Sequence, residues 1–239
     1  MKIIIASTRK WNKNILSNIG ENAEIMVKYI ERKEQLTYDN VKQYSPEYIF
    51  FPHWSHIIPQ DVYENFTCVV FHMTDLPFGR GGSPLQNLIS RGIYKTKITA
   101  LKCQKEIDSG DVYLKKELSL YGGAEEIYLR ASKIIKIMIL EILRKNIIPT
   151  KQIGEIVLFK RRTTEEGNMI DLCTLEECFD YIRMLDADGY PKAFLDIGNI
   201  HLEFERAALR NGHIKADVKI TMKEDKNEQE DIDSSSASR

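Results

Sequence analysis

The apolar positions of this chain fall into short runs typical of buried strands, separated by stretches with helical spacing. Apolar runs at Lys2–Ala6 and Met26–Ile30 predict two strands. The runs at Tyr48–Trp54 and Thr67–Phe71 predict two more, and helical spacing around Lys10–Ile19 predicts a helix after the first strand. Strands that alternate with helices predict a mainly parallel sheet with helices packed against it.

The next part of the chain has a hairpin pattern and then a long amphipathic helix. Lys97–Cys103 is rich in β-branched residues, and Val112–Leu120 is interpreted as the return arm of a hairpin. The pattern over Ala124–Asn146 is helical, and Pro149 ends it. One apolar stripe, expected to pack on the sheet, is formed by Ile127, Ala131, Ile134, Ile135, Met138, Ile139 and Ile142.

Beyond residue 150 the elements become shorter and more β-rich. Gly154–Lys160 predicts a strand, and Thr174 resembles the cap of a short helix. Three further strands are predicted at Ala193–Ile197, Ile200–Glu205 and Ile214–Thr221, with Gly-containing turns that suit hairpins.

These patterns predict an α/β fold with a Rossmann-like, mostly parallel twisted sheet and a small C-terminal β-rich appendage. We expect a catalytic domain over residues 1–150 and a helix and β-hairpin subdomain over residues 151–222. Residues 223–239 lack an apolar pattern and are expected to be a disordered tail.

Composition and charge narrow the class of protein. The chain has 239 residues and a net charge of −1, from 34 Lys and Arg against 35 Asp and Glu, which argues against a broad basic surface for nucleic acid. The N-terminal apolar run is too short for a signal peptide or a membrane span, so a cytoplasmic protein is expected. Cys173 and Cys178 have neither a second cysteine pair nor a nearby His, so we expect reduced thiols and no metal site.

The candidate chemistry follows the apolar run Cys68–Phe71. His72 comes directly after it, and three glycines and an arginine follow within ten residues. Further along, a carboxylate at Asp108 stands two residues before Gly110, again after a predicted strand. A histidine and a carboxylate that meet at the edge of a sheet where ligands bind suggest proton transfer, without naming a reaction.

The spacing of these residues resembles that of the folate-dependent formyltransferases. This family includes methionyl-tRNA formyltransferase, glycinamide ribonucleotide transformylase and sugar-nucleotide N-formyltransferases. Its members have a His at the end of a strand, then Leu-Pro and Arg-Gly-x-x-Pro, matched here by His72, Leu76-Pro77 and Arg80–Pro84. An Asp-x-Gly turn follows the next strand, and Asp108–Gly110 matches it.

The resemblance implies transfer of a formyl group from N10-formyltetrahydrofolate to an amine. His72 would act as the base and as an oxyanion partner, and Asp108 would orient His72 and relay the proton. The family has an Asn two residues before the His, where this chain has Val70. A replacement hydrogen-bond donor is therefore expected from residues 53–57 or 80–87, because the oxyanion needs a donor.

The resemblance also implies two sets of binding residues. The folate co-substrate is expected to contact Trp54, His56, Ile57, Gln104, Glu106, Ile107 and Asp108. The acceptor substrate is expected to contact Thr74, Phe78, Arg80, Gly81, Gly82 and Gln86.

Three classes of acceptor compete. The near-neutral charge and the short region after the long helix argue against tRNA, and the lack of glycine before Gly20 argues against a purine precursor. Gly79–Ile89 and residues 183–194 look most like the sugar-nucleotide class. This resemblance implies that the acceptor is the 4-amino group of a UDP- or dTDP-linked amino-deoxy sugar. Such an enzyme would serve surface polysaccharide, O-antigen or pseudaminic acid synthesis as a homodimer, without nucleic acid or membrane. Val70 leaves open a non-catalytic folate or nucleotide binder.

Overall fold

The computed structural model describes residues 1–9, 12, 19 and 24–223. The chain divides into two compact units, residues 1–162 and residues 163–239, and each is described by itself. Most of the predicted helix at Lys10–Ile19 and all of the predicted tail beyond residue 223 lie outside the described residues.

A six-stranded sheet in the order β2-β1-β3-β4-β6-β7 forms the centre of the first unit. Pairing is parallel from β2 through β4, whereas β4 with β6 and β6 with β7 are antiparallel. The prediction of a mostly parallel sheet is therefore confirmed. The strands are β1 (Lys2–Ala6), β2 (Met26–Ile30), β3 (Tyr48–Phe51), β4 (Cys68–His72), β6 (Lys95–Lys102) and β7 (Val112–Ser119).

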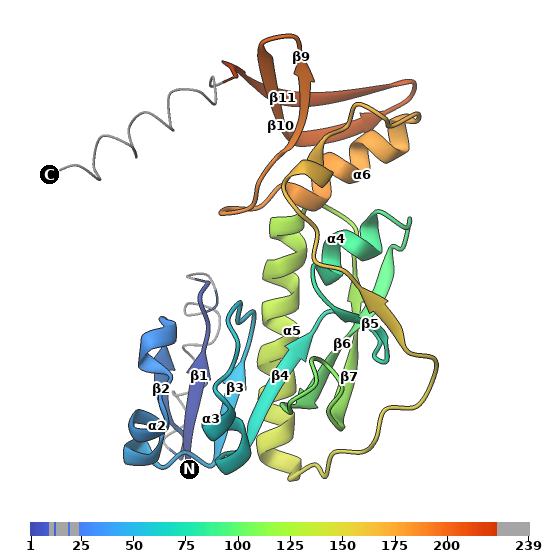
Figure 1. Ribbon diagram of the computed structural model, residues 1–239. Coiled ribbons are helices and arrows are strands. Elements are labelled where there is room, and N and C mark those ends of the chain that lie inside the picture. Colours follow the sequence, from blue (N-terminus) through green and yellow to red (C-terminus); the bar gives the residue numbers. More distant parts are fainter. Residues whose placement is uncertain (10–11, 13–18, 20–23, 224–239) are drawn as a thin grey trace, which may run out of the picture. The chain divides into compact units, whose positions relative to one another are not determined.

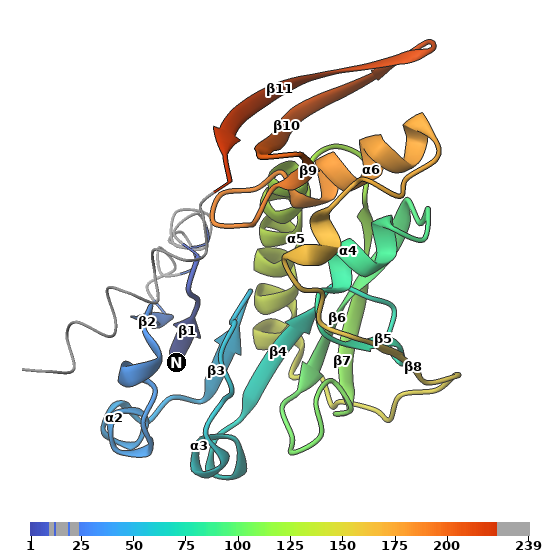
Figure 2. The same cartoon turned by 45° about the horizontal axis from the view of Figure 1, so that its top comes forward.

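Helices cover both faces of this sheet (Figures 1 and 2). On one face, α2 (Tyr38–Tyr44) and α3 (Gln60–Asn65) bury Val41 and Val62 against apolar side chains of β1, β3 and β4. A 3-10 turn at Lys33–Gln35 precedes α2.

The long helix α5 (Ala124–Lys145) packs against β6 and β7 on the other face (Figure 2). Burying each large aliphatic side chain contributes about 1.5–3 kcal/mol, so this helix anchors the sheet. Asn146 ends it in a left-handed conformation. Most of the predicted apolar stripe is buried: Ile127, Ala131, Ile135, Met138, Ile139 and Ile142.

A small parallel pair of strands joins distant parts of the first unit. β5 (Phe78–Gly81) pairs with β8 (Val157–Phe159), and α4 (Pro84–Ile89) follows β5. A Cβ on Gly81 would lie 2.4 Å from the carbonyl oxygen of Phe159, so only glycine permits this close pairing. Because β8 belongs to the first unit, the structure divides the chain after Arg162 rather than after residue 150.

The third predicted strand is shorter than its apolar and aromatic run suggested. β3 ends at Phe51, and the chain turns over Pro52 and His53, whose φ of 51° is left-handed. A residue with this φ cannot continue a strand.

The second unit contains the predicted appendage. A 3-10 turn at Glu165–Gly167 precedes α6 (Leu175–Leu185), whose first turn is capped by the Thr174 hydroxyl. β9 (Ala193–Ile197), β10 (Ile200–Arg210) and β11 (His213–Met222) form an antiparallel sheet in the order β11-β10-β9. The β-rich C-terminal part predicted from the hairpin turns is confirmed.

Two features are absent from the part of the chain that the structure describes. None of its helices combines the length and the apolar character that a bilayer crossing requires. Nor do three or more His, Cys, Asp or Glu side chains gather there as a metal-binding group.

Candidate active site

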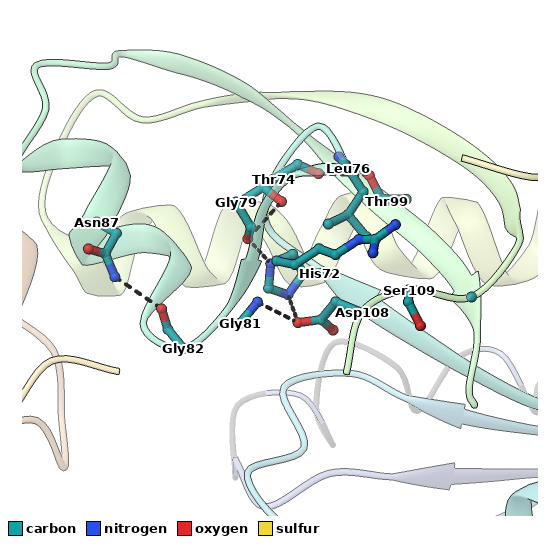
Figure 3. A network of polar contacts seen from close by, with 12 residues as sticks. His72, Thr74, Leu76, Gly79, Gly81, Gly82, Asn87, Thr99, Asp108 and Ser109 are labelled. Carbon is teal, nitrogen blue, oxygen red and sulfur yellow. Dashed lines mark hydrogen bonds and ion pairs between the residues drawn. The ribbon is translucent and has the colours of Figure 1, made fainter. Parts of the chain in front are cut away.

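His72 is the last residue of β4, and its imidazole is almost entirely buried. Its Nε2 lies 2.7 Å from the carbonyl oxygen of Gly79 (Figure 3). A carbonyl oxygen only accepts hydrogen bonds, so Nε2 carries the hydrogen in the neutral ring. Nδ1 is therefore the nitrogen with a free lone pair, and it can take up a proton.

Asp108 faces that free nitrogen. Its Oδ2 lies 3.4 Å from His72 Nδ1 and accepts a 2.9 Å hydrogen bond from the backbone N–H of Gly81 (Figure 3). The carboxylate is mostly buried. A proton arriving at Nδ1 would give an imidazolium beside a carboxylate, which stabilises the charged ring.

The route by which Asp108 reaches His72 differs from the prediction. The two side chains were expected to meet at one edge of the sheet, each following a strand, but β6 is antiparallel to β4 and pairs Lys102 with Val69 and Thr99 with His72. The carboxyl end of β6 therefore lies beside the amino end of β4, and the turn carrying Asp108 folds back toward His72.

Two backbone features shape this turn. Asp108 has a left-handed φ of 54°, a conformation that costs a non-glycine residue roughly 1–3 kcal/mol. A Cβ on Gly110 would lie 1.8 Å from the carbonyl oxygen of Lys102, which explains the glycine of the Asp-x-Gly motif.

The loop after His72 is tied to the neighbouring strand. The hydroxyl of Thr99 donates to the carbonyl of Thr74 at 2.7 Å and accepts from the N–H of Leu76 at 3.4 Å. The Thr74 hydroxyl donates to the Gly79 carbonyl at 3.4 Å, the same oxygen that holds His72 (Figure 3). Thr74, predicted to bind the acceptor, thus lies beside His72.

Arg80 and Gln152 connect this loop to the Asp108 turn. Arg80 donates through Nε and Nη2 to Gln152 Oε1, at 3.1 and 2.8 Å. The Gln152 Nε2 donates to the backbone carbonyls of Asp108 and Gly110, at 2.8 and 2.9 Å. Arg80, predicted to bind the acceptor, is thereby fixed within the site.

The other predicted acceptor residues occupy different surroundings. Gly82 donates its N–H to the carbonyl of Phe159, whose ring meets that of Phe78 edge to face. Gln86 is buried and donates to the hydroxyl of Tyr128 on α5 at 3.2 Å. Phe78, Arg80 and Gly81 belong to β5 and Gly82 directly follows it, whereas Gln86 lies in α4.

The predicted folate residues lie on two segments. Trp54 is half-buried against Phe51 and His56, whereas His56 and Ile57 are exposed. Gln104, Glu106 and Ile107 accompany Asp108 in its turn, where Gln104 donates to the hydroxyl of Ser109 at 2.6 Å.

His53 is a half-buried polar residue that follows the strand next to β4. β3 and β4 pair Phe51 with Val70, so His53 follows the end of the strand next to the one that ends in His72. Its Nε2 is shielded from solvent without a hydrogen-bond partner among the described residues, and its ring meets Tyr128 edge to face. Burial, and to a smaller extent the charge of Arg9, lower the pKa of His53 to about 4.

This pKa predicts a stability loss in mild acid. The unfolded chain binds a proton on His53 near its ordinary pKa of about 6.5, whereas the folded chain does so only near 4, so stability falls as the pH drops from 6.5 toward 4. Between pH 7 and 5 this group should contribute a loss of about 2 kcal/mol in unfolding free energy. Urea titrations of the wild type and His53→Gln at both pH values measure the difference.

The exposed His213 offers a matched control. His213→Gln should keep the full pH dependence of the wild type, while His53→Gln should lose about 2 kcal/mol of it. Identical dependence in all three proteins would show that His53 is not held neutral by burial.

The residues that sequence patterns missed act through the backbone. Gln152 lies in the irregular segment after α5, and Thr99 lies in the middle of β6. Their partners are mainly main-chain groups, which leave no spacing or residue-type signal in the sequence.

The fold and this centre define an α/β protein with a buried histidine that faces a carboxylate at the end of a central strand. Residues 6–133 match the family model described as formyl transferase, and residues 164–221 match that of the methionyl-tRNA formyltransferase C-terminal domain. The chain belongs to the formyl transferase family. The donor of this family is N10-formyltetrahydrofolate, so the predicted family and co-substrate are confirmed at that level.

Individual proteins with a known name show which members of the family the chain resembles. It is 55% identical to the solved structure titled methionyl-tRNA formyltransferase from Clostridium thermocellum, with a TM-score of 0.91 over 93% of this chain and 100% of that one. It is 28% identical to the methionyl-tRNA formyltransferase of Rickettsia massiliae, over 49% of this chain and 41% of that protein. The chain spans about half the length of the curated relatives it matches.

These comparisons overturn the predicted acceptor and partner. A sugar N-formyltransferase from Shewanella sp. FDAARGOS_354 is only 16% identical, with a TM-score of 0.64 over 95% of this chain and 99% of that one, which shows the fold alone. The predictions of a nucleotide-linked sugar, of a role in surface polysaccharide and of no nucleic acid are therefore wrong. The region after residue 150, judged too short for the tRNA enzymes, matches their C-terminal domain.

The argument against a nucleic-acid partner failed because it used the net charge of the whole chain. Residues 1–162 contain 25 Lys and Arg against 17 Asp and Glu, whereas residues 163–239 contain 9 against 18. The net charge of −1 conceals a basic first unit that carries the site.

Proposed function

We propose that this protein transfers the formyl group of N10-formyltetrahydrofolate to the α-amino group of methionyl-tRNA. The choice of methionyl-tRNA as the acceptor rests on the 55% identity, over 93% of the chain, to a protein titled methionyl-tRNA formyltransferase. The positive charge of residues 1–162 supports an acceptor rich in phosphates. A cytoplasmic location follows from the proposal, because charged tRNAs are used there.

The basic run at residues 160–162 supports contact with the phosphates of this acceptor. Lys160 and Arg161 are exposed, and the Arg162 N–H donates to the hydroxyl of Ser83 at 3.0 Å. A Cβ on Gly82 would lie 2.5 Å from Arg161 Cα, so this run lies against the loop of the site. Such charges hold a nucleic acid without reading its sequence.

The proposed reaction forms one bond and breaks another. The acceptor nitrogen attacks the formyl carbon, and the proton that it loses goes, directly or through water, to His72 Nδ1. The bond between the formyl carbon and N10 then breaks, and the proton passes to N10. Asp108 stabilises the imidazolium between these steps, and its second oxygen, which has no partner among the described residues, can hold the water.

The oxyanion formed on attack needs a donor that Val70 cannot supply. Three donors of residues 80–87 already have partners: Gly81 bonds Asp108, Gly82 bonds Phe159, and Asn87 donates to three backbone carbonyls. The ring nitrogens His53 Nε2 and Trp54 Nε1 are buried without a partner among the described residues.

We therefore expect a hydrogen-bond donor from residues 53–57 to lie about 3 Å from the formyl oxygen. A structure with a folate and an acceptor analogue bound would identify it. An active enzyme whose formyl oxygen faced only apolar atoms there would contradict this expectation.

The proposed function is tested with purified protein, N10-formyltetrahydrofolate and methionyl-tRNA. We expect formylmethionyl-tRNA, detected by acid gel, together with release of tetrahydrofolate followed by absorbance. Uncharged tRNA and free methionine are the controls. Transfer to other amines but not to methionyl-tRNA would reject the acceptor and keep the chemistry. Folate binding without any transfer would favour the non-catalytic binder.

A further inference from the structure

The side-chain amide of Gln152 makes four hydrogen bonds to groups around the proposed catalytic pair. Its oxygen accepts twice from Arg80, and its nitrogen donates to the carbonyls of Asp108 and Gly110. Gln152 is half-buried, and Thr150 fixes its segment through two backbone hydrogen bonds to Val112, at 2.7 and 2.9 Å. Both the oxygen and the nitrogen of the amide therefore have partners. The backbone near Gln152 is itself held in place by the pairing of Thr150 with Val112.

The Asp108 turn needs such a support. It folds back from the amino end of β4, and Asp108 holds a left-handed φ that is unfavourable without outside contacts. Its carboxylate has one backbone donor, the Gly81 N–H, and stands 3.4 Å from His72 Nδ1. The Gln152 nitrogen binds the carbonyls on both sides of Ser109, so it fixes the backbone that aims this carboxylate.

We propose that Gln152 is a positioning residue, which holds the Asp108 turn and the Arg80 guanidinium in the arrangement needed for formyl transfer. This inference rests on the proposed function. Gln152 need not touch either substrate, because it acts through the placement of Asp108. A displacement of about 1 Å in such a group can lower a rate on the order of 100-fold.

Gln152→Glu tests the proposal with almost no change of shape. The new carboxylate still accepts from Arg80, but it presents an oxygen to the carbonyl oxygens of Asp108 and Gly110, which repel it. We expect kcat to fall roughly 10- to 100-fold while KM for the folate changes less than about threefold. The matched control is Gln43→Glu, the same substitution on the exposed surface of α2, which should keep the wild-type rate.

A double variant separates positioning from general damage. If Gln152 acts through Asp108, Gln152→Glu should reduce the rate of Asp108→Asn far less than it reduces that of the wild type. Fully multiplicative losses would overturn the proposal, as would a Gln152→Glu enzyme with a wild-type kcat. Melting temperatures and circular dichroism show that each variant is folded.

A measurement without substrate distinguishes this inference from the proposed function. In the free protein, the 15N shifts of the His72 ring report the group that faces Nδ1. In Gln152→Ala they should move toward the values of Asp108→Asn. Unchanged shifts would overturn the positioning role. A wild type that fails to formylate methionyl-tRNA would reject the proposed function and leave this comparison intact.

Discussion

His72→Gln is expected to lower the turnover number at least about 100-fold, the scale of a lost general base. The Gln amide can still donate to the Gly79 carbonyl, so the loop keeps its contact, but the side chain no longer has a ring nitrogen that can accept the proton. We expect KM for the folate to change little. Initial rates of formylmethionyl-tRNA formation measure the effect.

His213→Gln serves as the matched control, because His213 is an exposed residue of the second unit. It should retain the wild-type rate. If His72→Gln also turned over at nearly the wild-type rate, the proton would have to leave by another route, and His72 would have no part in the chemistry.

Asp108→Asn is expected to lower turnover by a similar factor, at least about 100-fold. The Gly81 N–H requires an acceptor, so the Asn oxygen should stay where Oδ2 lies, and the geometry should persist. What disappears is the negative charge that stabilises a protonated His72. The loss should therefore appear in kcat rather than in the folate KM.

Asp111→Asn is the control for Asp108→Asn. Asp111 lies three residues further along the same connection and pairs with Lys102 through its backbone carbonyl, so its side chain has no role in the turn's pairing. Equal rate losses in the two variants would indicate general damage to this connection and would remove the specific role of Asp108.

Local periodicity predicted most elements of the fold. The stripe on α5 and the buried run of β4 are strong patterns, and both elements formed where expected. Strand direction and strand ends are weaker in sequence. An apolar run does not state which way its strand runs, so the antiparallel β6 was not anticipated, and aromatic residues after Phe51 concealed the turn at His53.

The sequence predicted those parts of the candidate site that are marked by a regular spacing of residues along the chain. The interval between His72 and the Arg-Gly motif, with the Asp-x-Gly turn, indicated the two side chains that the structure brings together. The support from Gln152 left no such trace, because its Nε2 binds backbone carbonyls that any residue could supply. The acceptor was misjudged from net charge, a quantity that hides how charge is distributed along the chain.

Because the Asp108 turn folds back from the end of β6, activity should be lost at a lower temperature than the folded structure. His72 belongs to a strand paired on both sides, whereas Asp108 is held by a few hydrogen bonds in a connection between strands. Opening such a connection requires less free energy than unfolding the sheet. On warming, catalysis should therefore cease reversibly while the sheet is still intact. Adaptation to heat or cold would then begin with substitutions in this connection, before any change in the core.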